Sequence, residues 1–152
     1  MIRLYVIILS FFSTLESNGQ TLETIRKHYL TSVNDKALCD SMIQKLQHKH
    51  DNPVHLAYLG AYQTVWANHI VNPIAKLSTF NKGKKNIESA VMQDKNNIEI
   101  RLIRWSVQTN APSFLNYNKD IDNDEAFIVK NKSKVTSKQL IILLKSLEQK
   151  QR

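Results

Sequence analysis

Two arginines and a glutamine stand at helical spacing in IEIRLIRWSVQTN, residues 98–110, and their chemistry suits the binding of an anion. At 100° per residue, Arg101, Arg104 and Gln108 fall on one polar edge. Guanidiniums one turn apart can hold a carboxylate or phosphate through paired hydrogen bonds. The same side chains can instead pair inside the protein, with Glu88 or with the acidic run DIDNDE at residues 120–125. The edge is a candidate binding site, and internal pairing is the open alternative.

A second candidate is a stripe of aromatic and histidine side chains on the apolar segment 53–71. At helical spacing the stripe occupies a sector of about 80°, and its members are His55, Tyr58, Tyr62, Trp66 and His69. It is either a buried seam or an apolar cleft with polar tips that could hold a ligand. His55 and His69 cannot share a metal ion, because fourteen residues of helix separate them by about 21 Å.

Metal ligation receives little support elsewhere. His48, His50 and Asp51 share one polar loop with His55, but zinc requires three or four ligands at fixed geometry. The acidic run resembles the start of a calcium loop, yet Glu125 stands where that loop needs glycine and Asn131 where it needs glutamate. We therefore expect an acid-rich helix start at the run, no metal site and no cofactor.

The elements that must position these side chains are helices. Three glycines and three prolines are too few for the frequent turns of a sandwich or barrel, and no alternating strand pattern is present. Helical periodicity predicts six or seven helices, at about 22–33, 38–46, 53–71, 73–94 with a break near Ser78, 98–110, 120–130 and 140–147.

Helix starts carry recognisable signals. Asn52-Pro53 and Asn72-Pro73 each place a capping side chain before a proline at the first helical position. Capping boxes are predicted where Ser32 precedes Asp35 and where Thr136 precedes Gln139.

Residues 98–110 have two opposed apolar stripes, which predicts an inner helix covered on both sides. One stripe contains Ile98, Leu102 and Trp105, and the other contains Ile100, Ile103 and Val107. A surface helix has only one such stripe. This segment is therefore expected to lie between neighbouring helices in a stack of helix pairs.

The segment FNKGKKNIESAVMQDKNN resembles the second helix of a tetratricopeptide repeat. Its matching positions are Phe80, Gly83, Ile87, Ala90 and Val91, whereas Lys95 stands where that family usually has proline. The whole chain is also similar to small exported helical proteins of Bacteroidota-type bacteria. These resemblances imply an all-α fold of antiparallel hairpins stacked as a tetratricopeptide-like right-handed array, and they imply no activity.

The first nineteen residues, MIRLYVIILSFFSTLESNG, have the layout of a secretory signal peptide. Arg3 precedes an apolar run from Leu4 to Phe12, and small residues stand at Ser17 and Gly19. We expect cleavage after Gly19, a single α-helical domain over residues 20–152, and a periplasmic or secreted protein. An uncleaved anchor or a buried first helix is the alternative.

Composition and compartment together limit the function. The net charge of +8 attracts anionic partners, and export makes nucleic acid a poor candidate. The single cysteine, Cys39, excludes an intrachain disulfide. We predict a non-catalytic interaction or scaffold protein without a permanent membrane span, whose partner is a protein or an anionic component of the cell envelope. The alternative is a small-ligand carrier or enzyme that uses the aromatic and histidine stripe as a cleft.

Overall fold

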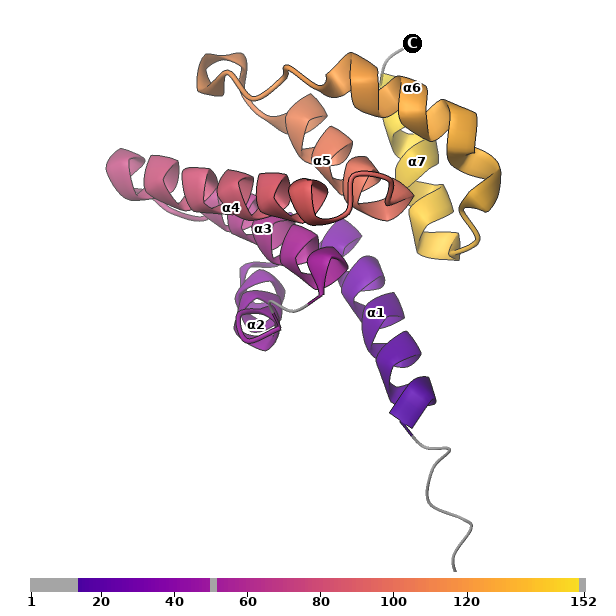
Figure 1. Ribbon diagram of the computed structural model, residues 1–152. Coiled ribbons are helices and arrows are strands. Elements are labelled where there is room, and N and C mark those ends of the chain that lie inside the picture. The colour runs from indigo at the N-terminus through magenta and orange to yellow at the C-terminus, as the bar shows by residue number, and fades with distance from the viewer. Residues whose placement is uncertain (1–13, 50–51, 151–152) are drawn as a thin grey trace, which may run out of the picture.

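The computed structural model describes residues 14–49 and 52–150, and within these ranges the protein is all-α, as predicted (Figure 1). Seven α-helices and two short 3₁₀ helices are present there, with no strand. In chain order they are α1 (Thr14–Thr31), α2 (Lys36–Leu46), α3 (Pro53–Asn68), α4 (Pro73–Gln93), α5 (Ile98–Asn110), η1 (Ser113–Leu115), α6 (Ile121–Asn131), η2 (Lys132–Lys134) and α7 (Lys138–Lys150).

Most of the predicted signal peptide, residues 1–13, lies outside the described residues. The predicted cleavage position after Gly19 falls within the first turns of α1. None of the helices in the described ranges combines the length and apolar character needed to cross a bilayer.

Asparagine side chains start three of the helices, and two of these starts were predicted. The side chains of Asn52 and Asn72 accept backbone N–H bonds at the starts of α3 and α4, with proline next in each case. Asn97 caps α5 in the same way. The predicted break near Ser78 is wrong, because α4 is continuous. Relative to alanine, serine in a helix interior lowers helix stability by only about 0.5 kcal/mol, which the neighbouring turns offset.

Both predicted capping boxes are wrong. Asp35 is itself the N-cap of α2 and accepts a 2.9 Å bond from the N–H of Leu38, while Ser32 donates its hydroxyl back to the carbonyl of Tyr29 at the end of α1. In α7 the first intrahelical carbonyl is that of Ser137 rather than Thr136. A serine hydroxyl can donate to carbonyls at the end of one helix, whereas aspartate accepts from N–H groups at the start of the next, so the Ser-x-x-Asp pattern alone does not define a capping box.

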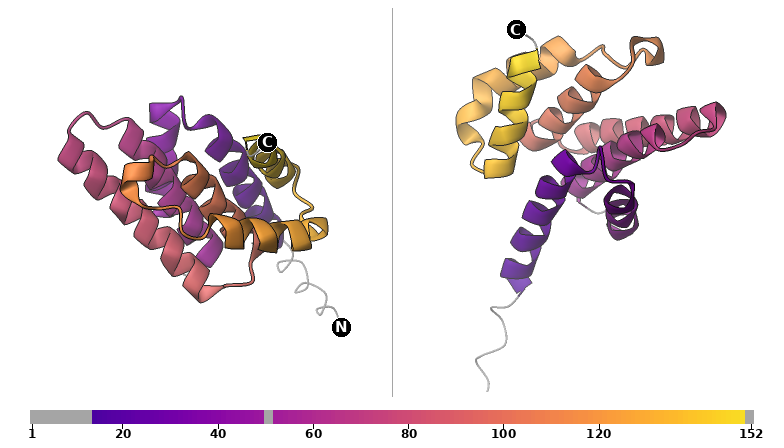
Figure 2. Two further views of the ribbon diagram at one scale, coloured as in Figure 1. Left: turned by 90° about the horizontal axis from the view of Figure 1, so that it is seen from above. Right: turned by 180° about the vertical axis from the view of Figure 1, so that it is seen from behind.

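The helices α3 and α4 form a tightly packed pair at the centre of the fold. A β-carbon added to Gly60 would stand 2.5 Å from the carbonyl oxygen of Gly83, and one added to Gly83 would stand 2.5 Å from the carbonyl oxygen of Gly60. The two backbones can approach this closely only because both residues lack side chains. α2 lies on one side of this pair, and α5, α6 and α7 lie on the other (Figures 1 and 2).

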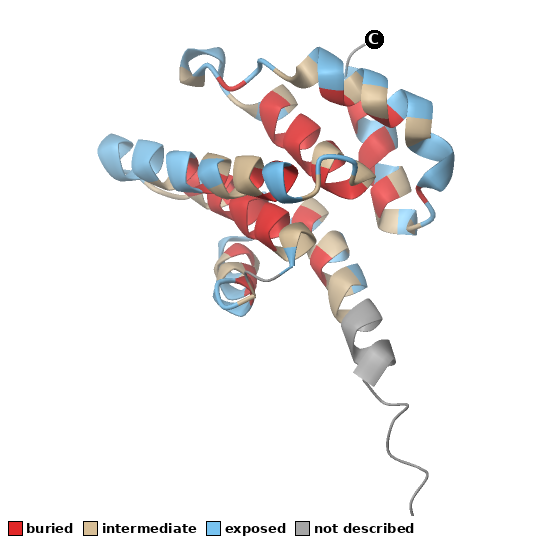
Figure 3. Cartoon of the chain, viewed as in Figure 1, coloured by how far each residue is buried: buried red, intermediate tan, exposed pale blue. Residues whose placement is uncertain are grey.

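α5 is the inner helix that its two stripes predicted. It contacts α3 and α4 as well as α6 and α7, and Ile100, Leu102, Ile103 and Trp105 are all fully buried. Burial is concentrated in α3 and α5, whereas the N-terminal end of α4 is exposed (Figure 3). The five α4 residues that resemble a tetratricopeptide repeat are the buried residues of that helix. A tetratricopeptide-like stacking of hairpins stays a prediction.

Candidate functional site

The arginine edge of α5 is paired with the acidic run, as the internal alternative predicted. Arg104 is only 5% exposed, and its Nε and Nη2 donate to the two carboxylate oxygens of Asp124 over 2.7 and 2.8 Å. Its Nη1 donates to Glu88 over 3.0 Å. Arg101 also donates its Nε to Asp124, a residue that is fully buried. All three nitrogens of the Arg104 guanidinium therefore bind carboxylates of the chain itself.

These contacts form an ion-pair network that connects α4, α5 and α6. The hydroxyl of Tyr117, in the loop before α6, donates to the second oxygen of Glu88 over 2.7 Å, and Asp120 lies 3.5 Å from Arg104. Burial alone would lower the pKa of Arg104, but the hydrogen bonds and charge of Asp124 outweigh it and raise the pKa above its ordinary value. Two guanidiniums and three carboxylates thus pair within the chain, and a role of this edge in ligand capture stays a prediction.

Gln108, the third member of the edge, is also internal. It is 2% exposed, and neither group of its amide has a hydrogen-bond partner in the part of the chain described. An unpaired buried amide costs on the order of 1–3 kcal/mol. Its position inside the packed layer leaves it no open surface on which to meet a partner.

The aromatic and histidine stripe is a closed seam at its centre. Tyr62 is fully buried and donates its hydroxyl to the carbonyl of Ile25 over 2.7 Å. The rings of Tyr58 and Tyr62 pack edge-on against Tyr29 of α1, with centroids 5.9 and 5.8 Å away. This is the core seam that the sequence offered as one of its two interpretations.

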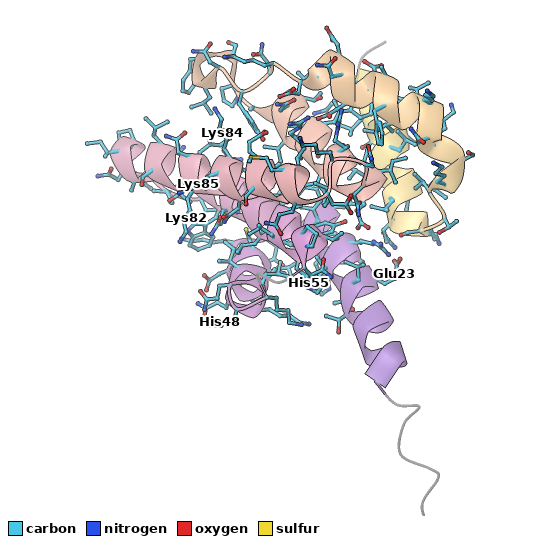
Figure 4. The ribbon with its side chains drawn as sticks, in the orientation of Figure 1. Glu23, His48, His55, Lys82, Lys84 and Lys85 are labelled. Carbon is cyan, nitrogen blue, oxygen red and sulfur yellow. The ribbon has the colours of Figure 1, made fainter. Side chains whose placement is uncertain are left out.

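The ends of the stripe are partly open but do not converge. Trp66 is half-buried, with the Nζ of Lys36 5.4 Å from its ring centroid. His69 lies beyond the end of α3 as its C-cap, 5.9 Å from Trp66 between ring centroids. His55 is half-buried near the start of α3, and His48 is exposed near the α2–α3 connection (Figure 4). Within the described ranges no three His, Cys, Asp or Glu side chains are placed to hold a metal, while His50 and Asp51 lie outside those ranges.

A second buried network was not foreseen from the sequence. Arg26 of α1 binds both carboxylate oxygens of Glu99 over 2.8 and 2.6 Å, and Tyr58 donates to the same carboxylate over 2.9 Å. Burial, with the charge of Glu99, raises the pKa of Tyr58 well above its ordinary value. A polar cavity of about 400 Å³ adjoins this network beside the starts of α5 and α7. Since Arg26 of α1 and Tyr58 of α3 both donate to Glu99 of α5, the network ties α1 and α3 to α5.

A larger hollow, an apolar cleft of about 850 Å³, lies at the other end of the molecule. It lies where α1, α3, α5 and α7 end and where α4 begins, and η1 forms part of its wall. We refer to it as the apolar cleft. Its apolar lining consists of Leu30, Val33, Val65, Ala67, Pro73, Leu77, Phe80, Val107, Ala111, Pro112, Phe114, Leu115, Leu143 and Leu147. None of the site residues predicted from the sequence lines it.

The polar groups of the apolar cleft are mostly engaged by the protein itself. The hydroxyl of Tyr29 is bonded to that of Ser106 at 3.1 Å, and Thr64 and Ser146 donate to carbonyls within their own helices. Lys76 and Lys150 are the charged residues of the lining, and Lys150 donates to the side chain of Asn110. The lining includes no carboxylate, histidine or cysteine. It therefore presents an apolar surface with two cations at its edge.

Exposed apolar side chains extend this surface beyond the cleft. Phe114 on η1 is 78% exposed and Ile74 on α4 is 80% exposed, while Val71 before α4 reaches 96%. Leu77 and Val33 are each about half exposed. Figures 1 and 2 show η1 and the N-terminal end of α4 projecting at the same end of the molecule. Apolar residues gathered in this way on a folded surface commonly mark an interaction site.

One sequence signal could have indicated the cleft. Val33 continues the apolar face of the first predicted helix, but α1 ends at Thr31 and Val33 is exposed at the cleft wall. Val33 follows the core pattern of the first helix but stays outside the core, so half of its side chain is left uncovered. The pattern alone could not show that residues 64–80, 106–115 and 143–150 would meet it.

No family model, curated protein or solved structure matches the chain.

Proposed function

We propose that this protein is an exported, non-catalytic interaction protein that binds a partner protein in the apolar cleft. The observation that carries the proposal is the cleft itself: a hollow of about 850 Å³ with apolar walls that include the exposed side chains of Phe114 and Leu77. Burying such side chains against a partner contributes about 1.5–3 kcal/mol each. The cleft replaces the arginine edge and the aromatic stripe as the expected contact face.

The chemistry of the lining supports binding rather than catalysis. Acid–base and nucleophilic catalysis rely on a carboxylate, histidine, cysteine or activated hydroxyl aimed at the substrate. The hydroxyls of Thr64, Ser106 and Ser146 already have partners inside the protein, and no His, Cys, Asp or Glu lines the cleft. The surface is suited to hold a ligand and offers no proton-transfer pair.

The extent of the exposed surface favours a protein over a small molecule. A small ligand is enclosed by its pocket, which covers most of the ligand surface. Here Val71 and Ile74 stay outside the hollow and remain highly exposed, so a cleft-filling small molecule would leave them in water. A protein can cover the cleft and these residues together.

A small-ligand carrier is the second candidate, and the volume of the cleft favours it. Ligand pockets commonly measure about 300–1,000 Å³ and are mainly apolar, and the apolar cleft falls in that range. This candidate no longer depends on the aromatic stripe, whose central Tyr62 is fully buried.

Export and a tetratricopeptide-like arrangement are part of the same proposal. Export is supported by the charge, apolar run and small residues of positions 1–19. The repeat-like arrangement is supported by the close α3–α4 pair, whose buried α4 residues are those that resemble the repeat. Helical-repeat proteins commonly use such surfaces to bind other proteins.

Site-specific photocrosslinking in the producing cell tests the function. A photoreactive phenylalanine analogue replaces Phe114 in one strain and Met92 in a control strain; Met92 is an equally exposed apolar residue at the far end of α4. We expect a protein adduct of discrete mass from position 114 that is absent from position 92. Equal adducts from both positions, or none from position 114 at normal expression, contradict the proposal.

A further inference from the structure

We infer that the occupant of the apolar cleft is an amphipathic helix of the partner, with an apolar stripe that enters the cleft and acidic residues that meet Lys76 and Lys150. This inference rests on the proposed function and specifies the partner surface. It follows from the backbone chemistry, the dimensions and the charges of the cleft.

The backbone chemistry of the walls selects a helix. The walls are formed by helices and by the short turns that follow α1 and α5, so the lining offers no strand edge for an incoming strand to pair with. The polar side chains of the lining are also mostly engaged. An extended segment placed there would lose its hydrogen bonds to water without replacement. A helix satisfies its own backbone and presents only side chains.

The volume of the cleft suits several side chains of one helix. Its apolar lining combines Leu77 and Phe80 of α4, Val107 of α5, and Phe114 and Leu115 of η1. The volume of about 850 Å³ is far more than one side chain requires. Apolar residues at helical positions i, i+3 or i+4, and i+7 form a single stripe, and such a stripe can occupy the cleft while its neighbours contact Ile74.

The two lysines define the charge of the occupant. Docking a partner removes water from Lys76 and Lys150, and removing water from an ammonium that has no carboxylate beside it is unfavourable. No carboxylate of the lining is available to pair with either of them. A partner that supplies carboxylates beside its apolar stripe compensates both charges, and the net charge of +8 speeds the encounter with an acidic surface.

The same charges argue against a second copy of this chain as occupant. In a symmetric dimer each protomer presents the same patch to the other. Two copies joined at this cleft would bring together two sets of Lys76 and Lys150 with no acid from the lining between them. A different, acidic partner is the better match.

Peptide selection on the purified protein tests the inference directly. The probe is a phage-displayed library of random peptides of about 16 residues, roughly 24 Å when helical. Selected peptides are synthesised, and their affinity is measured by fluorescence polarisation and their helicity by circular dichroism. We expect apolar residues at i, i+3 or i+4 and i+7, flanking Asp or Glu, and a gain of helicity on binding.

Matched variants locate the binding site on the protein. Leu77→Asp and Phe114→Asp, each in the cleft wall, should weaken binding about tenfold or more, whereas Met92→Asp on the same helix as Leu77 should change it less than about twofold. Lys76→Glu should lower the affinity for the acidic peptides. It should lower much less the affinity for a matched peptide in which Asn and Gln replace Asp and Glu. Lys85→Glu, also exposed on α4, is its charge control (Figure 4). Urea denaturation establishes that each variant is folded.

The outcomes separate this inference from the proposed function. Peptides that depend on Leu77 and Phe114 but bind without gaining helicity, or without acidic residues, overturn the inference and leave a protein-binding cleft intact. Dodecanoate is the lipid-like probe of the competing class. If no selected peptide depends on the cleft residues while dodecanoate binding does, the cleft holds small amphiphiles and the protein-binding function fails as well.

Discussion

The buried carboxylate of Asp124 pairs with two guanidiniums. Its carboxylate is fully buried and accepts bonds from Arg101 and Arg104, and the Arg101 guanidinium also lies over the ring of Phe127, 4.8 Å from its centroid. Removing one partner of a buried ion pair leaves an uncompensated charge, which costs more than the pair itself contributes. The stability of the α5–α6 contact therefore depends strongly on this one carboxylate.

Replacing Asp124 with asparagine should lower the free energy of unfolding by about 3–5 kcal/mol, because two buried or partly buried arginines lose their shared anion. Urea denaturation at pH 7 measures the change. Asp122→Asn is the matched control, since Asp122 is exposed in the same first turn of α6 and should shift stability by less than about 0.5 kcal/mol. Equal urea midpoints for the two variants would show that the buried network contributes no more to the free energy of unfolding than an exposed carboxylate does.

Cys39 should make the protein less stable in alkali. Its thiol is buried and donates to the carbonyl of Tyr62 over 3.3 Å, and burial, with the charge of Asp40, raises its pKa from 9.0 to about 12. Between these values the unfolded chain loses the thiol proton and the folded chain keeps it, so stability falls as pH rises from about 9 towards 12. Urea midpoints measured at pH 8 and pH 10.5 should fall more steeply for the wild-type protein than for Cys39→Ala.

The matched reagent test for Cys39 is alkylation. Iodoacetamide reacts with the thiolate, so labelling at pH 8.5 should be slow in the folded protein and fast in urea. Rapid labelling of the folded protein would contradict both the burial and the raised pKa of this thiol.

At the scale of the elements, the α3–α4 pair depends on two glycines. A methyl group on Gly60 would meet the carbonyl oxygen of Gly83 at 2.5 Å and the Cγ1 of Ile87 at 2.8 Å. The first neighbour is backbone, so relief requires the two helices to move apart. Glycine at this crossing is therefore a steric requirement, despite its low helix propensity.

Gly60→Ala and Gly83→Ala should each lower stability by about 1–3 kcal/mol or more, as overpacking does, although alanine is the better helix former by about 1 kcal/mol. Thermal unfolding followed by circular dichroism measures the effect. Ser78→Ala, on the exposed part of α4, should raise the melting temperature slightly. If the glycine variants were also stabilised, the close crossing of α3 and α4 would be wrong.

Local chemistry explains which element features were predictable. Asn52-Pro53 and Asn72-Pro73 marked helix starts correctly because a cap involves only neighbouring residues. The Ser32 cap was misplaced because a serine hydroxyl bonds as well to a carbonyl behind it as to an N–H group ahead. The Thr136 cap was misplaced by one residue, since the first carbonyl bonded within α7 is that of Ser137. The opposed stripes of α5 were interpreted correctly, since burial on two sides requires apolar residues on two sides.

At the scale of the whole molecule, the proposed export is the prediction that most constrains the partner. The purified cellular protein should begin at Gln20 and should occur in the periplasmic or secreted fraction, because signal peptidase cuts after small residues such as Gly19. Cell fractionation followed by N-terminal sequencing measures both. Cytoplasmic protein with Met1 intact would remove the export proposal and reopen nucleic acid as a partner.

The site was less predictable than the fold, and the reason is geometric. Arg101, Arg104 and Gln108 were selected because their types suit anion binding, but residue type does not reveal that Asp124 and Glu88 lie within hydrogen-bond distance. Tyr62 and Trp66 were grouped on one helix face, yet only the position of α1 decides that Tyr62 is closed off and Trp66 is not. The cleft is lined by residues from five separated segments, whose meeting no periodicity specifies.

The sequence by itself determined the helical class, most helix boundaries, the inner position of α5 and the basic surface, because these follow from periodicity, capping and charge along a short stretch of chain. Only the tertiary structure decided which polar groups neutralise each other and which apolar residues remain without a partner. Those outcomes depend on distances between segments far apart in the chain. A side chain becomes core or contact surface according to whether another helix arrives to cover it.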